Sequence, residues 1–243
     1  MNAVVAQLTA RSLLGRRRVL VLLMLPAVLL ILCGLVRLLA GSDTTVTVGL
    51  LGGFALATVV PLVGLIAGAG SIGPEIDDGS IVYLMSKPLS RHSIVLSKLA
   101  VAVVVVTVVA AVPTLLAGLV LSGTSEGLAV GYGIGAGVAG LAYCALFVLL
   151  AVVTRNAVVI GLIYVLIWES LVGNFVPGAQ VLSIQQWALA ITEKVVGSTA
   201  GPLFGVGSAV SFGTGVALLA IVVIACTWYA GSRLRTLRLT GTE

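Results

Sequence analysis

Few residues in this sequence are of the types that break bonds or bind metals. The one histidine is His92, and the three cysteines, Cys33, Cys144 and Cys226, lie inside apolar runs without a CxxC pair. No HExxH pattern occurs, and no Walker-type GxxxxGKS/T sequence could bind ATP. Catalysis in a membrane needs a nucleophile with a base, a metal, or carboxylates sharing a cavity. The sequence therefore argues against an enzyme, a metal site and a bound cofactor, and it predicts cysteines packed as small apolar side chains.

The composition points to a membrane protein. Of the 243 residues, 60% are hydrophobic and only 9% are charged, whereas about 25% are charged in ordinary globular proteins. Several apolar runs exceed the roughly 18 residues that mark a transmembrane helix. The formal net charge is +5, but the basic residues flank apolar spans and are not interleaved with exposed aromatic residues, so nucleic acid is not an expected partner. The expected surroundings are the lipid bilayer.

The apolar segments predict an all-α, polytopic protein with six transmembrane helices. Each predicted helix has at least 20 residues, enough to cross a hydrocarbon core of about 30 Å. We expect a single membrane domain over residues 1–243, with a cytoplasmic loop at 73–98 and an outer segment at 177–206. The predicted spans are 19–40, 47–72, 99–121, 128–153, 157–176 and 207–231.

The basic residues predict the orientation, because Lys and Arg concentrate in short cytoplasmic loops. With six spans, only Arg37 and Lys194 fall on the outer side, out of 13 Lys and Arg residues. Both termini are therefore expected in the cytoplasm, with the chain in the cell membrane. Residues 2–14 are expected to form an amphipathic helix along the inner surface, with Val4, Val5 and Leu8 on one face. The inner-side basic residues are Arg11, Arg16, Arg17, Arg18, Lys87, Arg91, Lys98, Arg155, Arg233, Arg235 and Arg238.

Glycines and prolines give further expectations within the spans. Pro61 and Pro113 each remove a backbone donor and are expected to kink their helices. Glycine stripes allow two helix backbones to approach closely, either within one chain or at a homodimer seam. The stripes comprise Gly127, Gly131 and Gly135, with Gly133 and Gly137 beside them, and Gly64 with Gly68 in the second span.

The longest cytoplasmic loop is the most structured polar segment on the inner side. Three carboxylates, Glu75, Asp77 and Asp78, precede an apolar stretch, so a short helix is expected to begin near Asp77 or Asp78. Pro88 ends that helix, and Ser90 caps a second one leading into the third span. Local physics alone fits a solvated, well-capped loop equally well.

The loop resembles the first intracellular loop of type-2 ABC exporter permeases, where a Glu-x-Glu-x-Gly-Thr element precedes a leucine, a Pro-Leu-Ser-Arg corner and a basic residue. The present loop differs by Asp77 for Glu, Ser80 for Thr, and Ile76 where a basic residue is common. Six spans, cytoplasmic termini and a basic N-terminal helix extend the similarity across nearly the whole chain. The pattern is carried by Glu75, Asp77, Gly79, Ser80, Leu84, Pro88, Ser90, Arg91 and Lys98.

The resemblance implies that the loop is a coupling helix seated on a separate ABC ATPase subunit. It implies two copies of that ATPase, which bind the ATP and Mg²⁺, a second permease copy or paralogue, and transport in the direction of export. A non-transporting integral-membrane assembly or regulatory subunit is the alternative. The residues assigned to the ATPase contact are Glu75, Asp77, Asp78, Gly79, Ser80, Leu84, Pro88 and Arg91.

The outer side offers one intramembrane acid. Glu169 follows Ala157 by 12 residues, or roughly 18 Å of α-helix, which places it past the midplane. It is either a structural acid or part of an outer gate or substrate path. Beyond it, residues 183–196 predict an amphipathic helix on the outer surface, similar to the lid or re-entrant helices of the resembled family, or a plain interfacial loop. The sparse polar groups weakly favour a lipid-like cargo over a sugar or ion.

Overall fold

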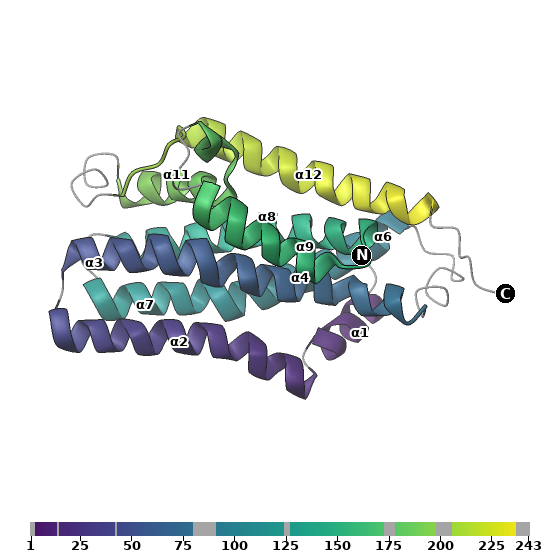
Figure 1. Cartoon of the computed structure of the whole chain (residues 1–243), viewed down its shortest axis with the longest axis horizontal. Helices are drawn as coiled ribbons and strands as arrows, with labels where there is room; N and C mark the ends of the chain where they lie inside the picture. Colours follow the sequence, from purple (N-terminus) through teal and green to yellow (C-terminus); the bar gives the residue numbers. More distant parts are fainter. Residues whose placement is uncertain are drawn as a thin grey trace.

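The computed structural model shows an all-helical bundle (Figure 1). It describes residues 3–13, 15–41, 43–79, 91–123, 127–172, 178–197 and 206–236, and no strand occurs within these ranges. The helices on the N-terminal side are α1 (Ala3–Leu13), α2 (Arg16–Ala40), α3 (Thr44–Val48), η1 (Gly49–Val59), α4 (Val60–Asp77), α6 (Arg91–Val106), η2 (Thr107–Ala111) and α7 (Val112–Ser122). The helices that follow are α8 (Leu128–Val153), α9 (Ala157–Ile163), η4 (Tyr164–Val172), η5 (Ala179–Leu182), α11 (Ile184–Val196) and α12 (Phe212–Thr236).

Five helical stretches within the described residues are long and apolar enough to cross a membrane. The fifth predicted span, 157–176, corresponds to α9 and η4, whose apolar part, Ala157–Glu169, is shorter than the others. Five crossings are therefore supported, and a sixth stays a prediction. The five stretches are Val19–Leu39, Thr44–Ile76, Arg91–Ser122, Leu128–Val153 and Phe212–Leu234.

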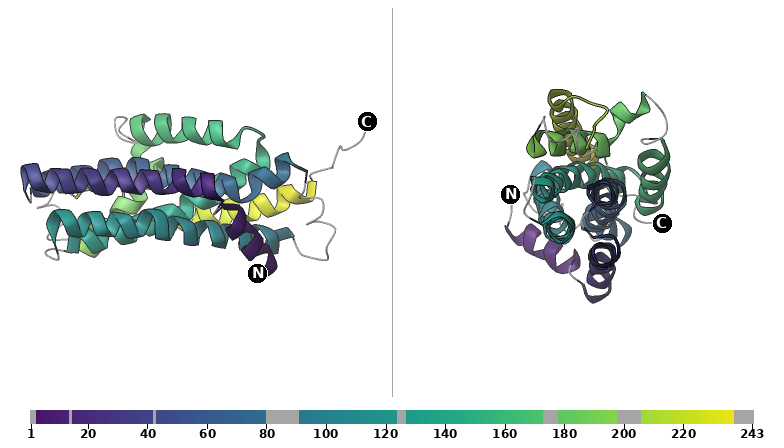
Figure 2. Two further views of the ribbon diagram at one scale, coloured as in Figure 1. Left: turned by 90° about the horizontal axis from the view of Figure 1, so that it is seen from below. Right: turned by 90° about the vertical axis from the view of Figure 1, so that its left-hand side faces the viewer.

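Helix α8 is the central element of the bundle. It packs against α4, α7, α11 and α12, and the end-on view of Figure 2 shows the other helices around it. Tyr132, Tyr143 and Phe147 on α8 are fully buried, as are Cys33 and Cys144, while Cys226 is nearly so. The cysteines pack in the core, as their apolar surroundings in the sequence predicted.

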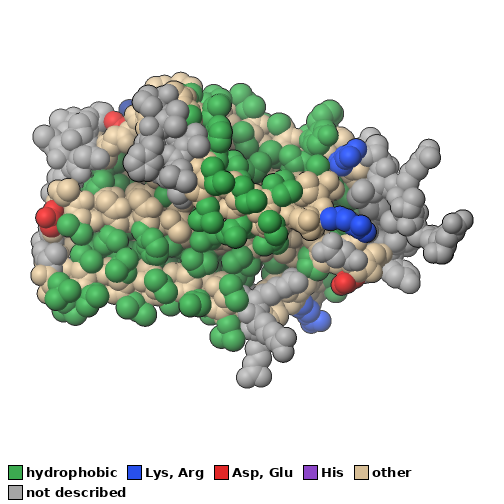
Figure 3. All heavy atoms as spheres, in the orientation of Figure 1, with side chains coloured by type: hydrophobic (Ala, Val, Ile, Leu, Met, Phe, Trp, Pro, Cys, Tyr) green, Lys and Arg blue, Asp and Glu red, His purple; other side chains and the backbone are tan. Residues whose placement is uncertain are grey.

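The polarity of the bundle surface changes along the long axis of the bundle. Figure 3 shows hydrophobic side chains over the middle of one face and Lys and Arg side chains toward the end where Figure 1 places both termini. Large apolar side chains are exposed along α2, α9 and α12, among them Leu38, Val159 and Ile224. Such a belt is unfavourable in water and is stable in lipid.

Two of the prolines within the membrane-crossing helices follow π-helical segments. Pro61 is the second residue of α4, directly after η1, and Pro113 is the second residue of α7, directly after η2. Proline has no N–H for the usual bond, and its ring clashes with the carbonyl four residues earlier, so the preceding turn widens. The expected disturbance of the helix is thus a local change of helical pitch.

The glycine stripes serve packing within the chain. A Cβ atom on Gly64 would lie 2.9 Å from the Cβ of Tyr143, and one on Gly68 would lie 3.0 Å from the Cβ of Phe147, so α4 and α8 are in close contact. On another face of α8, Gly131 and Gly135 make room for α11 in the same way. Intramolecular packing, one of the two expected roles, is therefore confirmed.

The N-terminal helix α1 has the predicted extent but a different buried face. Val5, Thr9 and Leu13 are buried, whereas Leu8 is 52% exposed. The buried residues recur every four positions, and α1 packs on α6 and α4 along that stripe. Thr9 can be buried in this stripe because its hydroxyl donates to the Val5 carbonyl at 2.8 Å. Leu8 lies outside the stripe that packs on the bundle, and its predicted contact with the membrane surface stays a prediction.

Candidate functional site

The acidic residues of the cytoplasmic loop lie at the end of one helix. Glu75 and Asp77 belong to the last turn of α4, and Asp78 is its C-cap. A helix start at Asp77 or Asp78 themselves is therefore wrong, while the rest of the predicted helix falls in residues that the structure does not describe. The carboxylates of Glu75 and Asp78 lie at the negative end of the α4 dipole, where they need compensation from elsewhere.

Gly79 ends α4 through its backbone conformation. Its φ angle is +68°, in the left-handed region that favours glycine, and its N–H donates to the carbonyl of Ile76 at 3.3 Å. The Asp78 N–H donates to the Pro74 carbonyl at 2.9 Å. This is a glycine-terminated helix C-terminus, and it leaves Asp78 and Gly79 exposed.

Lys98 supplies the compensating charge. Its Nζ atom donates to Oε1 of Glu75 at 2.6 Å and to the carbonyl of Ser71 at 2.7 Å. The Lys98 side chain is fully buried, while that of Glu75 is 26% exposed. The pair connects α4 to α6 at the base of the loop, so the two helices that flank the loop are held in one geometry.

The start of α6 is also attached to the last helix of the chain. Arg91 begins α6, as predicted, and its Nη1 donates to the carbonyl of Leu234 near the end of α12. His92 lies against Gly231, where an added Cβ atom would come within 2.5 Å of its ring. A cation at a helix C-terminus is favourable, and the contact links the loop to α12.

The other predicted loop residues are not described by the structure. Ser80, Leu84, Pro88 and the capping Ser90 fall in residues 80–90, outside the described ranges, and so does the predicted short helix. The side chain of Asp77 is likewise not described. Of the eight predicted contact residues, the structure therefore describes five. Four lie at the end of α4, namely Glu75, Asp77, Asp78 and Gly79, and Arg91 lies at the start of α6.

At the opposite end of the bundle, Glu169 is fully buried. Its carboxylate accepts hydrogen bonds from the Ser183 hydroxyl at 2.5 Å, the Tyr164 hydroxyl at 3.0 Å and the Ile184 N–H at 3.1 Å. The Gln185 N–H lies within 3.5 Å. Glu169, from η4, therefore caps the N-terminus of α11, where a negative charge is favoured.

Helix α11 is an inserted helix and not a surface one. Gln185 and Gln186 are buried: Gln185 donates to the carbonyl of Gly52 at 3.0 Å, and Gln186 accepts the Ala209 N–H at 3.2 Å. The apolar Val195, in contrast, is 40% exposed. The surface prediction is wrong because both amides are buried and each bonds to a backbone group inside the bundle, although Oε1 of Gln185 is buried without a hydrogen-bond partner among the described residues.

Sequence reasoning missed the partners of both charged sites. Lys98 was part of the loop pattern, but nothing assigned it to Glu75; a lysine at a predicted membrane boundary, 23 residues after an acid, is a usable signal. Ser183 precedes the apolar periodicity of α11 and reads as an N-cap. The acid that completes that cap comes from another segment, which sequence spacing does not reveal.

The bundle, its apolar belt and its charged ends define a polytopic integral membrane protein. A protein-family model described as ABC-2 family transporter protein matches residues 4–233, nearly the whole chain. The chain belongs to this family and is a permease subunit of an ABC transporter, which confirms the resemblance seen in the loop. Members of this family work with an ABC ATPase in the membrane. Neither the curated proteins nor the solved structures searched contain a match.

Proposed function

We propose that this permease is the membrane half of an exporter, driven by two copies of a separate ATPase that seat on the α4–α6 junction. The ATPase binds the ATP and Mg²⁺, and this chain supplies the pathway together with a second permease copy or paralogue. Both termini and the junction face the cytoplasm. The gathering of Lys and Arg at that end supports this orientation (Figure 3).

The single observation that carries the proposal is the pair of attachments around the loop. Lys98 ties α6 to α4, and Arg91 ties the start of α6 to the end of α12. A displacement of the segment between Gly79 and Arg91 is therefore passed to three helices at once. Packed helices change between discrete arrangements, so such a push can switch the bundle between inward and outward access.

At the end of the bundle opposite the loop, we assign α11 to an outer gate. Helix α11 is inserted between α8 and α12, and Glu169 fixes its N-terminus to η4. An outward-open state requires movement near α11, because this helix packs on α8 and α12 at the end of the bundle where α3 lies (Figure 1). In this proposal Glu169 holds α11 in a fixed position relative to η4. It acts as a positioning residue for that helix.

Site-specific crosslinking tests the docking site. Asp78 and Asp43 are exposed acids that flank helix ends at opposite ends of the bundle, and the native cysteines are buried. We expect Asp78→Cys, but not the matched control Asp43→Cys, to form a crosslink with the partner ABC ATPase, in membranes that contain both proteins. Crosslinking from Asp43→Cys alone would reverse the orientation, and co-purification without any Asp78→Cys crosslink would favour an assembly subunit that docks elsewhere.

A further inference from the structure

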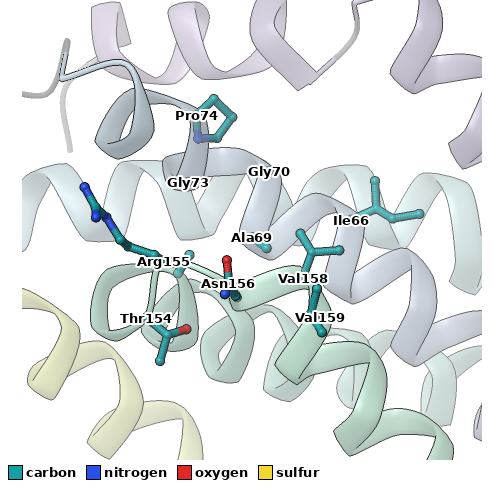
Figure 4. Close-up of a pocket in the computed structure, with 12 residues that line it drawn as sticks. Ile66, Ala69, Gly70, Gly73, Pro74, Thr154, Arg155, Asn156, Val158 and Val159 are labelled. Atoms are coloured by element: carbon teal, nitrogen blue, oxygen red, sulfur yellow. The ribbon is translucent and has the colours of Figure 1, made fainter.

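A pocket of about 450 Å³ opens between α4 and the corner that joins α8 to α9 (Figure 4). On the α4 side its wall is made of small residues, among them Ala69, Gly70 and Gly73. Short side chains there leave a furrow along the helix. This volume is in the range of small-molecule binding sites. Neither Glu75, Lys98 nor any residue of α11 lines the pocket, although Pro74, directly before Glu75, does.

The pocket joins an apolar surface to a polar rim. Val158 and Val159 line it and are each 58% exposed, at the start of the apolar α9 surface that continues to Ile163. The rim is formed by Arg155 and Asn156 in the turn before α9. Figure 4 shows the Arg155 side chain extending outward from this turn, on the side of the pocket away from Ile66, Val158 and Val159.

Arg155 brings a positive charge to this rim. Its side chain is exposed, and in the part of the chain that the structure describes it forms no ion pair. Thr154, beside it, uses its hydroxyl to donate to the Leu150 carbonyl at 2.9 Å. The site therefore offers a permanently charged guanidinium beside apolar walls, at the end of the bundle that the basic residues assign to the cytoplasm.

From this arrangement we propose that the pocket binds an anionic phospholipid of the inner leaflet. The phosphate lies on Arg155, and an acyl chain follows Ile66, Val158 and Val159 in the furrow. Basic sites between transmembrane helices on the cytoplasmic side are suited to acidic headgroups. A free phosphate ion fits less well, because one cation is offered and the remaining walls are apolar. The proposal rests on the orientation proposed above but on neither ATP nor the ATPase.

Native mass spectrometry of the purified full-length chain tests the site. Phosphatidylglycerol and phosphatidylcholine with the same acyl chains are added at equal concentration, and the bound fractions are compared. We expect preferential retention of phosphatidylglycerol, reduced about tenfold in Arg155→Gln through loss of a charge-assisted hydrogen bond. Arg11→Gln is the matched control, since Arg11 is an exposed arginine of α1 that does not line the pocket.

A second pair of variants tests the furrow itself. Val158→Trp places a large ring in the pocket, whereas Ile160→Trp alters the same helix at a residue that is 42% exposed and outside the lining. Only Val158→Trp is expected to reduce retention. Equal retention of the two lipids, or retention unchanged in both Arg155→Gln and Val158→Trp, would overturn the proposal. Loss in Arg155→Gln alone would also overturn it, because the lipid would then bind the guanidinium outside the furrow. Displacement by millimolar inorganic phosphate would identify an anion site instead.

Discussion

Lys98 and Glu75 are separated by 23 residues in the chain, yet the Lys98 ammonium donates to the Glu75 carboxylate at 2.6 Å. The ammonium is completely shielded from solvent, and the carboxylate is partly exposed toward the loop. A buried charge requires a partner, so neither residue can be changed alone without loss. The pair is thus both a structural attachment between α4 and α6 and the place where a docked partner can act on them.

The first prediction concerns the stability that this pair provides. Glu75→Gln leaves the Lys98 ammonium buried without a carboxylate and should lower the free energy of unfolding by about 3 kcal/mol. The double variant Glu75→Gln/Lys98→Met removes both charges and should recover much of that loss. Thermal unfolding can be followed with a thiol-reactive fluorophore, because the three cysteines are buried in the folded protein. A double variant less stable than Glu75→Gln would contradict this account.

The second prediction concerns Gly79. Among the residues that the structure describes, no neighbour lies within 4 Å of a Cβ atom built there, so the cost of substitution comes from the backbone φ of +68°. Gly79→Val should strain the helix end by roughly 1–2 kcal/mol and uncouple ATP hydrolysis from transport in vesicles that contain the ATPase. Gly79→Asn is the matched control, since asparagine tolerates this region. Normal coupling in a well-folded Gly79→Val variant would count against the loop as the coupling element.

The sequence predicted the long apolar elements well. The span predicted at 128–153 is found as α8, Leu128–Val153, because its apolar run is uninterrupted and ends at a polar Thr-Arg-Asn turn. The second and third spans begin or end beyond their predicted limits, as α4 continues to Asp77 and α6 begins at Arg91. Charged residues can extend a helix past the apolar run when they find partners, as Glu75 and Lys98 do.

The sites were less predictable, because their partners come from separate segments. Glu169 was expected past the midplane, but its position at the N-terminus of α11 depends on how the chain returns after η4. The burial of Gln185 depends on the Gly52 carbonyl, 133 residues away. Periodicity places a residue on a helix face, and it does not reveal whether that face meets water or a backbone carbonyl.

The third prediction compares two glycines on α8. A Cβ atom on Gly135 would lie 2.2 Å from Oγ1 of Thr192, whereas one on Gly137 would meet only the Ala111 Cβ, at 3.8 Å. Gly135→Ala should push α11 away and destabilise the protein by about 1–3 kcal/mol. Gly137→Ala should be neutral or stabilising by up to about 1 kcal/mol, through helix propensity. Melting temperatures of the two variants check this, and equal values would show that α11 is not packed closely on Gly135.

The fourth prediction concerns the cap of α11. Glu169→Gln keeps the shape of the side chain but leaves one acceptor oxygen for the donors of Ser183, Tyr164 and Ile184. We expect a loss of about 2 kcal/mol in stability, because hydrogen bonds to a charged group are replaced by weaker ones.

The matched control for that change is Glu193→Gln, which alters a carboxylate within α11 itself. Glu193 is partly exposed and accepts a hydrogen bond from the Ser208 hydroxyl at 2.9 Å, so its removal should cost less. If Glu169 positions an outer gate, transport in vesicles should fall in Glu169→Gln while ATP hydrolysis continues, and it should be retained in Glu193→Gln. Reduced melting temperature with full transport in Glu169→Gln would limit this acid to a structural role, because α11 would then be loosened without any effect on the pathway.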